Sequence, residues 1–430
     1  MSFVSDSAMA ARSASYLMAV TTTELKNSAL EAIAAALLGN SEAIEAENRK
    51  DLADAETNGL AMPLRKRLRF DAGKISAAVE GIKSLISLPD PVGRTLLGTE
   101  MDEGLNLYRV TCPIGVIGII FESRPDALVQ IASLCLKAGN AVLLKGGSEA
   151  AHTNRILTDI IVKASVEAGI PSGWAALLES RSDVAEMLKL DEYIDLIIPR
   201  GSNAFVQYIM QNSSIPVLGH ADGVCHVYVH EKADPEMAVR LAVDSKTQYV
   251  AVCNAAETLL IDESVAPDML PILAKALEEN NVILHGCEKA AAIWPMKPVS
   301  EWHHEYLDYE MSVHIVSGEE DAIRHINRYG SGHTDAIITE DREAALRFLE
   351  AVDSGSVFWN CSTRFSDGFK YGFGAEVGIS TSKIHARGPV GLEGLVTYKY
   401  KLFGSGQTAA DYASGKKQFT HRPISEKPEK

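Results

Sequence analysis

The chain has 430 residues, of which 46% are apolar and 23% charged, with a net charge of −16 and a sequence pI of about 5.3. This length suits two or three globular domains, and the acidic balance argues against nucleic acid or an anionic membrane as a partner, because both would repel the chain. No segment is long and apolar enough to predict a membrane span, and the start of the chain lacks the pattern of a signal peptide, so we expect a cytoplasmic protein without a membrane partner.

The six cysteines are scattered singly, which is typical of reduced thiols in a cytosolic protein and not of a disulfide framework. Adjacent histidines occur in "WHHEY" (302–306), but no second group of ligands follows at a useful spacing. From this spacing we expect no metal site.

In chain order, residues from about 8 to 85 show apolar residues at helical spacing. The prolines of "LPDPVG" (88–93) end this helical region, and the stretch 99–115 then resembles a short hairpin-like extension.

From residue 114 the pattern changes to short apolar runs separated by helices. "IGVIGIIF" (114–121) suits a strand that is buried on both faces, and "PDALVQIASLCLKAGN" (125–140) a helix with proline near its start and glycine near its end. Strands alternating with helices predict βαβ units and a parallel sheet. A second block of the same kind begins near residue 241, and a polar tail begins near 410, which we expect to be mobile or draped over a neighbour.

The lone cysteine of "KTQYVAVCNAAETLL" (246–260), Cys253, stands just before an apolar strand. A cysteine in this setting is more often a small buried apolar residue than a nucleophile, because reactivity requires an accessible and stabilised thiolate. From the local residues alone, both interpretations stay open.

Two predicted strands end in residues suited to nucleotide binding. Lys145 lies in "LLKGGS" and Gly201 and Ser202 lie in "PRGSNAF", at the carboxyl ends of strands, where ligands of parallel sheets bind. The alternatives are a tight turn with a solvated lysine and an ordinary serine N-cap. Arg387, in the loop "HARGPVGLEGL", would suit a carboxylate or a phosphate, with a rigid surface turn as the alternative.

Several motifs in succession resemble the gamma-glutamyl phosphate reductases, also called glutamate-5-semialdehyde dehydrogenases, a branch of the aldehyde dehydrogenase superfamily. The resemblance covers residues from about 10 to 408. The motifs that carry it are "CPIGVIGIIFESRPDA", "LLKGGSEA", "IPRGSNAF", "PVLGHADGVCHVYV", "AVCNAAETLL", "INRYGSGHTDAI", "GFGAEVGIS" and "HARGPVGLEGL".

This resemblance implies an aldehyde dehydrogenase-like α/β fold with two Rossmann-like parallel-sheet domains and a small oligomerisation element. The NADP-binding domain would take residues 1–97 and 112–237, and the catalytic domain residues 238–392. The oligomerisation element would combine residues 98–111 and 393–408, which implies a homo-oligomer, and residues 409–430 would form the polar tail.

The resemblance also assigns roles to single residues. Cys253 falls on the catalytic cysteine of the superfamily, Lys145 on its ribose-binding lysine, Gly201 and Ser202 on its turn at the pyrophosphate, and Glu305 on the glutamate that touches the nicotinamide ribose.

Three positions depart from the usual pattern of the superfamily. Val217 stands where other members carry the glutamate that activates water, and a valine cannot accept a proton. Ser148 replaces the glutamate that would bind the ribose 2′-hydroxyl, which favours NADP. Ser123 replaces the asparagine of the oxyanion hole, so Asn254 or backbone amides would stabilise the oxyanion instead.

The implied reaction is the NADPH-dependent reduction of L-glutamyl 5-phosphate through a cysteine thioester, the second step of proline biosynthesis from glutamate. Candidates for holding the substrate or phosphate are Arg124, Arg364, Arg387 and His220, with Arg387 ranked first. A separate glutamate kinase stays open as a partner. The alternatives are a hydrolytic aldehyde dehydrogenase acting on a related small substrate and a nucleotide-binding module without catalysis.

Overall fold

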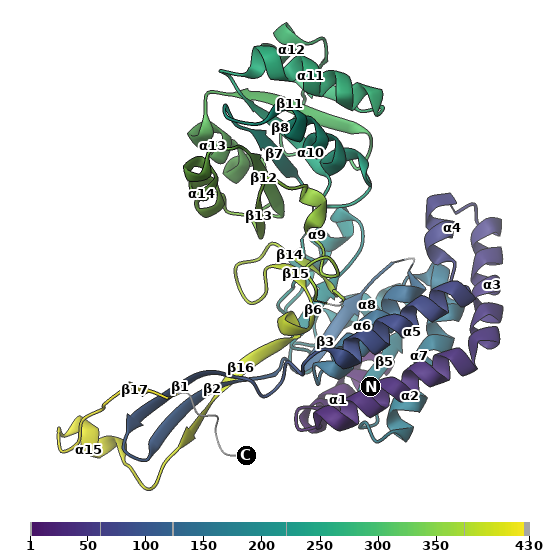
Figure 1. Ribbon diagram of the computed structural model, residues 1–430. Coiled ribbons are helices and arrows are strands. Elements are labelled where there is room, and N and C mark those ends of the chain that lie inside the picture. Colours follow the sequence, from purple (N-terminus) through teal and green to yellow (C-terminus); the bar gives the residue numbers. More distant parts are fainter. Residues whose placement is uncertain (1, 61, 123, 221, 374, 425–430) are drawn as a thin grey trace.

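The computed structural model of the chain describes residues 2–60, 62–122, 124–220, 222–373 and 375–424. Two bodies, each built on a parallel sheet, meet at a junction from which a narrow arm projects (Figure 1). The predicted α/β class, with two parallel sheets and a separate small element, is confirmed.

The first domain contains a parallel sheet of strand order β5-β4-β3-β6. Strands β3 and β4 are buried along their whole length, and their alternating side chains enter two different apolar clusters. Ile117 and Ile119 face α2, α5, α6 and α7, whereas Val116 and Ile120 face α1 and α8. A sheet covered on both faces accounts for the continuous apolar runs seen in the sequence. The elements of this domain are α1 (Phe3–Met18), α2 (Thr23–Gly39), α3 (Ser41–Thr57), α4 (Met62–Leu68), α5 (Ala72–Ser87), β3 (Val116–Ile120), α6 (Pro125–Lys137), β4 (Ala141–Lys145), η1 (Ser148–Ala150), α7 (Ala151–Glu167), β5 (Ala175–Leu178), α8 (Arg181–Met187), β6 (Leu196–Pro199) and α9 (Asn203–Asn212).

The second domain contains a parallel sheet of order β10-β9-β11-β8-β7-β12-β13. One face packs against α10, α11 and α12, and the other against α13 and α14. Helix α10 begins where Asp234 accepts a hydrogen bond from the amide of Met237 and where a proline occupies the first turn. The elements are β7 (Cys225–Val229), α10 (Pro235–Thr247), β8 (Ala256–Asp262), α11 (Ala266–Glu279), β9 (Ile283–Gly286), α12 (Glu288–Ile293), β10 (Lys297–Pro298), β11 (Glu310–Val316), α13 (Glu319–Tyr329), β12 (Thr334–Ile338), α14 (Arg342–Ala351), β13 (Ser356–Trp359) and η2 (Thr363–Phe365).

The predicted boundary between residues 237 and 238 is wrong. Strand β7 precedes that boundary, yet it pairs with β8 on one side and with β12 on the other, in the middle of the second sheet. Alternation of strands and helices along a sequence does not indicate which of two sheets a strand joins.

The arm is an antiparallel sheet of order β16-β2-β1-β17. The hairpin of β1 and β2 confirms the predicted extension, and β16 pairs with β2 over its whole length. The tail differs from the prediction, because residues 409–424 fold back along the chain's own arm through α15 and β17, while residues 425–430 lie outside the described ranges. The elements of the arm and of its junction are β1 (Thr95–Asp102), β2 (Leu105–Pro113), β14 (Gly378–Ser380), β15 (Gly388–Val390), η3 (Leu392–Leu395), β16 (Val396–Phe403), α15 (Ala409–Ala413) and β17 (Arg422–Pro423).

Candidate active site

A cavity of about 530 Å³ lies where the two domains meet. Residues that follow β3 and β6 form one wall, and the loop that precedes β8 forms the other, so the carboxyl ends of the first sheet face the amino ends of the second. In Figure 1, helix α9 and the hairpin of β14 and β15 occupy this junction. Its lining includes Phe121, Glu122, Arg124, Arg200, Gly201, Ser202, Asn203, His220, Cys253, Glu305, Leu307, Glu376 and Ile379.

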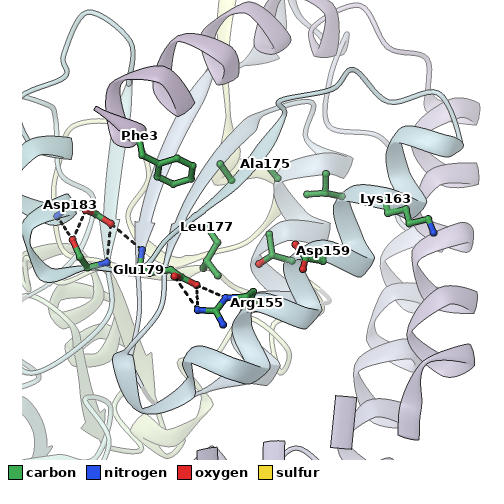
Figure 2. Close-up of a pocket in the computed structure, with 12 residues that line it drawn as sticks. Phe3, Arg155, Asp159, Lys163, Ala175, Leu177, Glu179 and Asp183 are labelled. Atoms are coloured by element: carbon green, nitrogen blue, oxygen red, sulfur yellow. Dashed lines mark hydrogen bonds and ion pairs between the residues drawn. The ribbon is translucent and has the colours of Figure 1, made fainter. Parts of the chain in front are cut away.

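A second cavity, of about 740 Å³, lies along the edge strand β5 (Figure 2). Here Arg155 from α7 and Glu179, just after β5, form an ion pair with N–O distances of 2.9 and 3.1 Å. Its described lining includes none of the predicted site residues. The junction between the domains is therefore the site that the chemistry indicates.

Cys253 lies in the loop that enters β8, and its half-buried side chain lines the junction cavity. The loop packs directly against the backbone of Gly223, where an added Cβ atom would come within 2.1 Å of the Cys253 carbonyl oxygen. Cys253 Sγ lies 3.1 Å from Nε2 of His333, the residue that precedes β12. A thiol and an imidazole are thus brought together by the loops that enter two strands of one sheet.

The charges around Cys253 oppose its ionisation. Burial, followed by the carboxylates of Glu305 and Glu376, raises the pKa of the Cys253 thiol to about 12, and Arg200 acts in the opposite direction. Burial and the neighbouring His220 hold the pKa of His333 well below its usual value. A neutral thiol therefore faces a neutral imidazole at pH 7, and both pKa shifts oppose transfer of the proton between them in the unliganded protein.

The predicted cofactor residues lie at the carboxyl ends of the first sheet. Gly201 and Ser202 line the cavity at the start of α9, and the Ser202 side chain does not cap that helix. Instead, the Ser202 amide donates to the carboxylate of Glu122. An anion thus already occupies the N-terminus of α9, which is where the pyrophosphate of a dinucleotide would bind.

Lys145, Ser148 and Glu305 complete the predicted cofactor set. Lys145 ends β4 with a buried side chain, and Ser148 is exposed at the start of η1. Glu305 lines the cavity from the second domain and accepts a hydrogen bond of 2.7 Å from the side chain of Asn203, the first residue of α9. Glu149 folds back over Gly147, where a Cβ atom would lie 2.0 Å from its carboxylate oxygen. Gly201, Ser202 and Glu305 line the cavity and fit a dinucleotide, whereas Lys145 and Ser148 are not among its described lining residues, and a carboxylate lies one residue beyond Ser148.

The predicted substrate-binding arginines occupy different places. Arg124 lines the cavity with a partly exposed side chain. Arg364 donates from Nε to Gln248 at 2.9 Å, and its pKa is lowered by burial and partly restored by the nearby Cys253 sulfur. Arg387, ranked first from the sequence, pairs with Asp353 at 3.0 Å and is not among the described residues that line the cavity. Its ranking is not supported by this position, since the guanidinium is already paired.

Three further predictions concern the oxyanion and water. The Asn254 side-chain amide donates to the Ser366 carbonyl at 2.8 Å, and the residue is not part of the described cavity lining. Ser123 lies outside the described residues. Val217 packs in an apolar cluster of the first domain, but Glu122, Glu305 and Glu376 line the cavity. The cavity therefore holds carboxylates other than the one that Val217 replaces.

Sequence reasoning missed His333, Arg200 and Glu376. Burial, followed by the positive charge of Arg124, lowers the pKa of Arg200, and the negative charges of Glu376 and Cys253 act in the opposite direction. The four side chains therefore lie close together. The signal for Arg200 was present, because it directly follows strand β6 beside the recognised Gly201. For His333 the only signal was its position just before a buried strand.

Among the described residues, no helix combines the length and the apolar character that crossing a bilayer requires.

The chain matches the aldehyde dehydrogenase family over residues 4–297 and 311–396. It is 64% identical to a gamma-glutamyl phosphate reductase from Pelotomaculum thermopropionicum over 96% of each chain. The crystal structure of gamma-glutamyl phosphate reductase from Thermotoga maritima superposes with a TM-score of 0.93 at 39% identity, covering 95% of this chain and 100% of that one. An acetylating aldehyde dehydrogenase from Geobacillus thermoglucosidasius, at 18% identity and a TM-score of 0.63 over 94% and 97% of the two chains, shares the fold. The chain therefore belongs to the aldehyde dehydrogenase family and, within it, to the gamma-glutamyl phosphate reductases.

Proposed function

We propose that the chain reduces L-glutamyl 5-phosphate to L-glutamate 5-semialdehyde and phosphate, with NADPH as the reductant and Cys253 as the nucleophile. The observation that carries the mechanism is the 3.1 Å contact between Cys253 Sγ and His333 Nε2 at a cavity shared by both domains. The semialdehyde then closes onto its own amine, which places the reaction in the formation of proline from glutamate.

In the first step, the Cys253 thiol gives its proton to His333, and the thiolate attacks the acyl carbon of the substrate. The bond between that carbon and the phosphate oxygen breaks, phosphate takes a proton from water, and a thioester remains on Cys253. Arg124 and Arg200, whose charges act on each other, are placed to attract the phosphate, and Arg364 lies close enough to Cys253 to assist.

When bound, the reduced nicotinamide supplies the hydride that converts the thioester to the aldehyde. The Cys253 thiolate is the leaving group of that step, and it recovers its proton from His333. Lys145 and Glu305 would hold the two riboses, and Gly201 and Ser202 the pyrophosphate, after Glu122 withdraws from the start of α9. Ser148 supports NADP over NAD, because it brings no negative charge toward a 2′-phosphate.

Hydrolysis of the thioester to a free acid is the second candidate, and Glu376 favours it. This carboxylate lines the cavity, and burial raises its pKa, which suits a general base. Oxidation of the semialdehyde with NADP separates the two candidates. An enzyme that passes the acyl group from Cys253 to phosphate requires phosphate in this direction, whereas a hydrolytic enzyme turns over equally well without it.

We also propose that the arm joins copies of the chain into a homo-oligomer, with a glutamate kinase as a separate supplier of substrate. Tyr398, Tyr400 and Leu402 are about half exposed on β16, and the described strands of the arm form a single sheet. The cysteines are all free thiols, which suits the reducing cytoplasm.

Replacement of the nucleophile tests the proposal. Cys253→Ala should abolish formation of NADPH from semialdehyde, phosphate and NADP, while Cys361→Ala, at a half-buried cysteine elsewhere in the second domain, should retain it. Turnover of the Cys253→Ala protein near that of the wild type would refute the covalent mechanism.

A further inference from the structure

We propose that His220, Cys253 and His333 form a binding site for a zinc-class divalent ion, and that an ion bound there blocks the enzyme reversibly. This inference goes beyond the proposed reaction, and it is decided by ion binding itself, whether or not the chain reduces an acyl phosphate.

The three donors come from segments that the fold brings together. His220 lies shortly before β7, Cys253 before β8 and His333 immediately before β12, and these strands are neighbours in the second sheet. One ligand atom of each residue lies within 4.8 Å of the other two. No local motif links residues so far apart in the sequence, which explains why spacing along the chain did not reveal the cluster.

The distances suit a small ion after a modest adjustment. Zinc binds imidazole nitrogen at about 2.0 Å and thiolate sulfur at about 2.3 Å, so tetrahedral ligands lie roughly 3.5 Å apart. The Cys253–His333 pair, at 3.1 Å, is already near this separation. The His220 ring, whose centroid is 4.9 Å from that of His333, needs to move by roughly 1 Å for its nitrogen to join them.

Both imidazoles are oriented by hydrogen bonds on the nitrogen that faces away from the cluster. His220 Nδ1 lies 3.0 Å from the Ile379 carbonyl, which accepts and so places the proton on Nδ1. His333 Nδ1 lies 2.8 Å from Thr334 Oγ1. The Ile379 carbonyl fixes Nδ1 as the donor in His220, and the Thr334 hydroxyl can accept a proton from Nδ1 of His333. In that tautomer each Nε2 carries the free lone pair that a metal requires, an arrangement found around metal-bound histidines.

The donor set selects the class of ion. Two imidazoles and one thiolate favour Zn²⁺ or Co²⁺ over Mg²⁺ and Ca²⁺, which prefer oxygen ligands. Glu305 and Glu376, which act electrostatically on Cys253, supply negative charge beside the ion. The sulfur bound to the ion is no longer available to attack the acyl carbon, so the ion and the substrate exclude each other.

Cobalt titration tests the site directly. Protein freed of metal by a chelator should bind one equivalent of Co²⁺ and gain the near-ultraviolet absorption of a cobalt–thiolate bond. Cys253→Ser should remove this absorption, and His220→Ala should weaken Co²⁺ binding at least tenfold. Cys287→Ala is the matched control, because Cys287 is also half-buried and also has a histidine partner, His314.

Inhibition supplies the second measurement. Zn²⁺ should inhibit the wild type, and a chelator should restore its rate. His220→Ala should need at least ten times more Zn²⁺ than the wild type for half-inhibition, with each protein compared with its own uninhibited rate. The proposal fails if the cobalt–thiolate absorption survives in Cys253→Ser, if it is lost in Cys287→Ala, or if the wild type binds no Co²⁺. A protein without reductase activity that still shows the Cys253-dependent absorption would refute the proposed function and leave the metal site standing.

Discussion

At the scale of single residues, the chemistry depends on a thiol that resists ionisation. The pKa of Cys253 is raised from its ordinary 9.0 to about 12, mainly by burial. Because thiolate is the reactive form, alkylation of the free enzyme by iodoacetamide should become faster with rising pH and should show no plateau near pH 9. The rate of inactivation, measured between pH 6 and pH 10, checks this, with reactivity at Cys253 followed by peptide mass. A plateau below pH 8 would contradict the raised pKa.

His333 should matter for turnover, because it is the proposed acceptor of the Cys253 proton. His333→Gln keeps a polar side chain but removes the proton acceptor, and general base catalysis typically contributes about 10² to 10⁴ in rate. We expect kcat to fall by about that factor, with a smaller change in KM, in steady-state assays. The equivalent change at His303, an exposed histidine on another loop, is the control. A variant that retains the wild-type kcat would exclude His333 as the base.

Cofactor preference also depends on single residues. Ser148→Glu places a carboxylate where the 2′-phosphate of NADP is expected, so the ratio of kcat/KM for NADPH to that for NADH should fall at least about tenfold, or ~1.4 kcal/mol. Glu149→Gln should raise the same ratio if the neighbouring carboxylate opposes NADP. Paired assays with both cofactors give the ratio for each variant. An unchanged ratio in Ser148→Glu would show that Ser148 does not face that phosphate.

At the scale of elements, a buried ion pair links α10 to β8. Lys246 and Glu257 are both fully buried and lie 2.6 Å apart, and the other Glu257 oxygen accepts from the amide of Leu307. Leu307 has a φ of 54°, a backbone conformation that is uncommon for leucine, and it lies in the loop that carries Glu305. The pair therefore fixes part of the cavity wall as well as the core of the domain.

Breaking this pair should destabilise the protein strongly. Lys246→Met leaves a buried carboxylate without its cation, which costs about 3–5 kcal/mol in the free energy of unfolding. Burial, opposed by Lys246, already raises the pKa of Glu257 to about 7, and losing the lysine raises this pKa further. A carboxyl group whose pKa is raised in the folded state makes that state lose stability as the pH rises through the folded-state pKa. The unfolding free energy lost in Lys246→Met should therefore be larger at pH 8 than at pH 6.

Urea unfolding followed by circular dichroism at both pH values measures this deficit. Lys289→Met provides the matched control, because Lys289 pairs with Glu263 at 3.0 Å on the surface, where such pairs contribute less than about 1 kcal/mol. Equal effects of the two substitutions would contradict the role given to the buried pair.

At the scale of the whole molecule, the proposed role of the arm in assembly can be tested. Tyr400→Asp combined with Leu402→Asp places two charges on the exposed strand β16, so the mass in solution should fall toward that of one chain. Light scattering after size-exclusion chromatography measures it. Tyr16→Asp, at an exposed tyrosine of α1, is the control. An unchanged mass in a folded double variant would exclude this face of the arm as the interface.

Local patterns predicted the helices, the parallel strands and the residues at strand ends, because burial on both faces leaves continuous apolar runs. Lys145, Gly201 and Ser202 were found in this way, and resemblance to a family added Cys253 and Glu305. The remaining features depend on contacts between distant segments. They include the place of β7 in the second sheet, the pairing of β17 with β1, the proximity of His333 to Cys253, and the engagement of Arg387 with Asp353. A single sequence carries no signal for such contacts when each residue also suits an ordinary loop.

The construction of the arm has a consequence for synthesis on the ribosome. Strand β2 is made well before its neighbour β16 and before Tyr412 of α15, whose side chain donates to Asp102 across 310 positions. Until those residues emerge, the early hairpin of β1 and β2 lacks its outer partners and the exposed apolar residues of β16. Nascent chains therefore do not carry the complete arm until β16 and the residues that follow it have emerged.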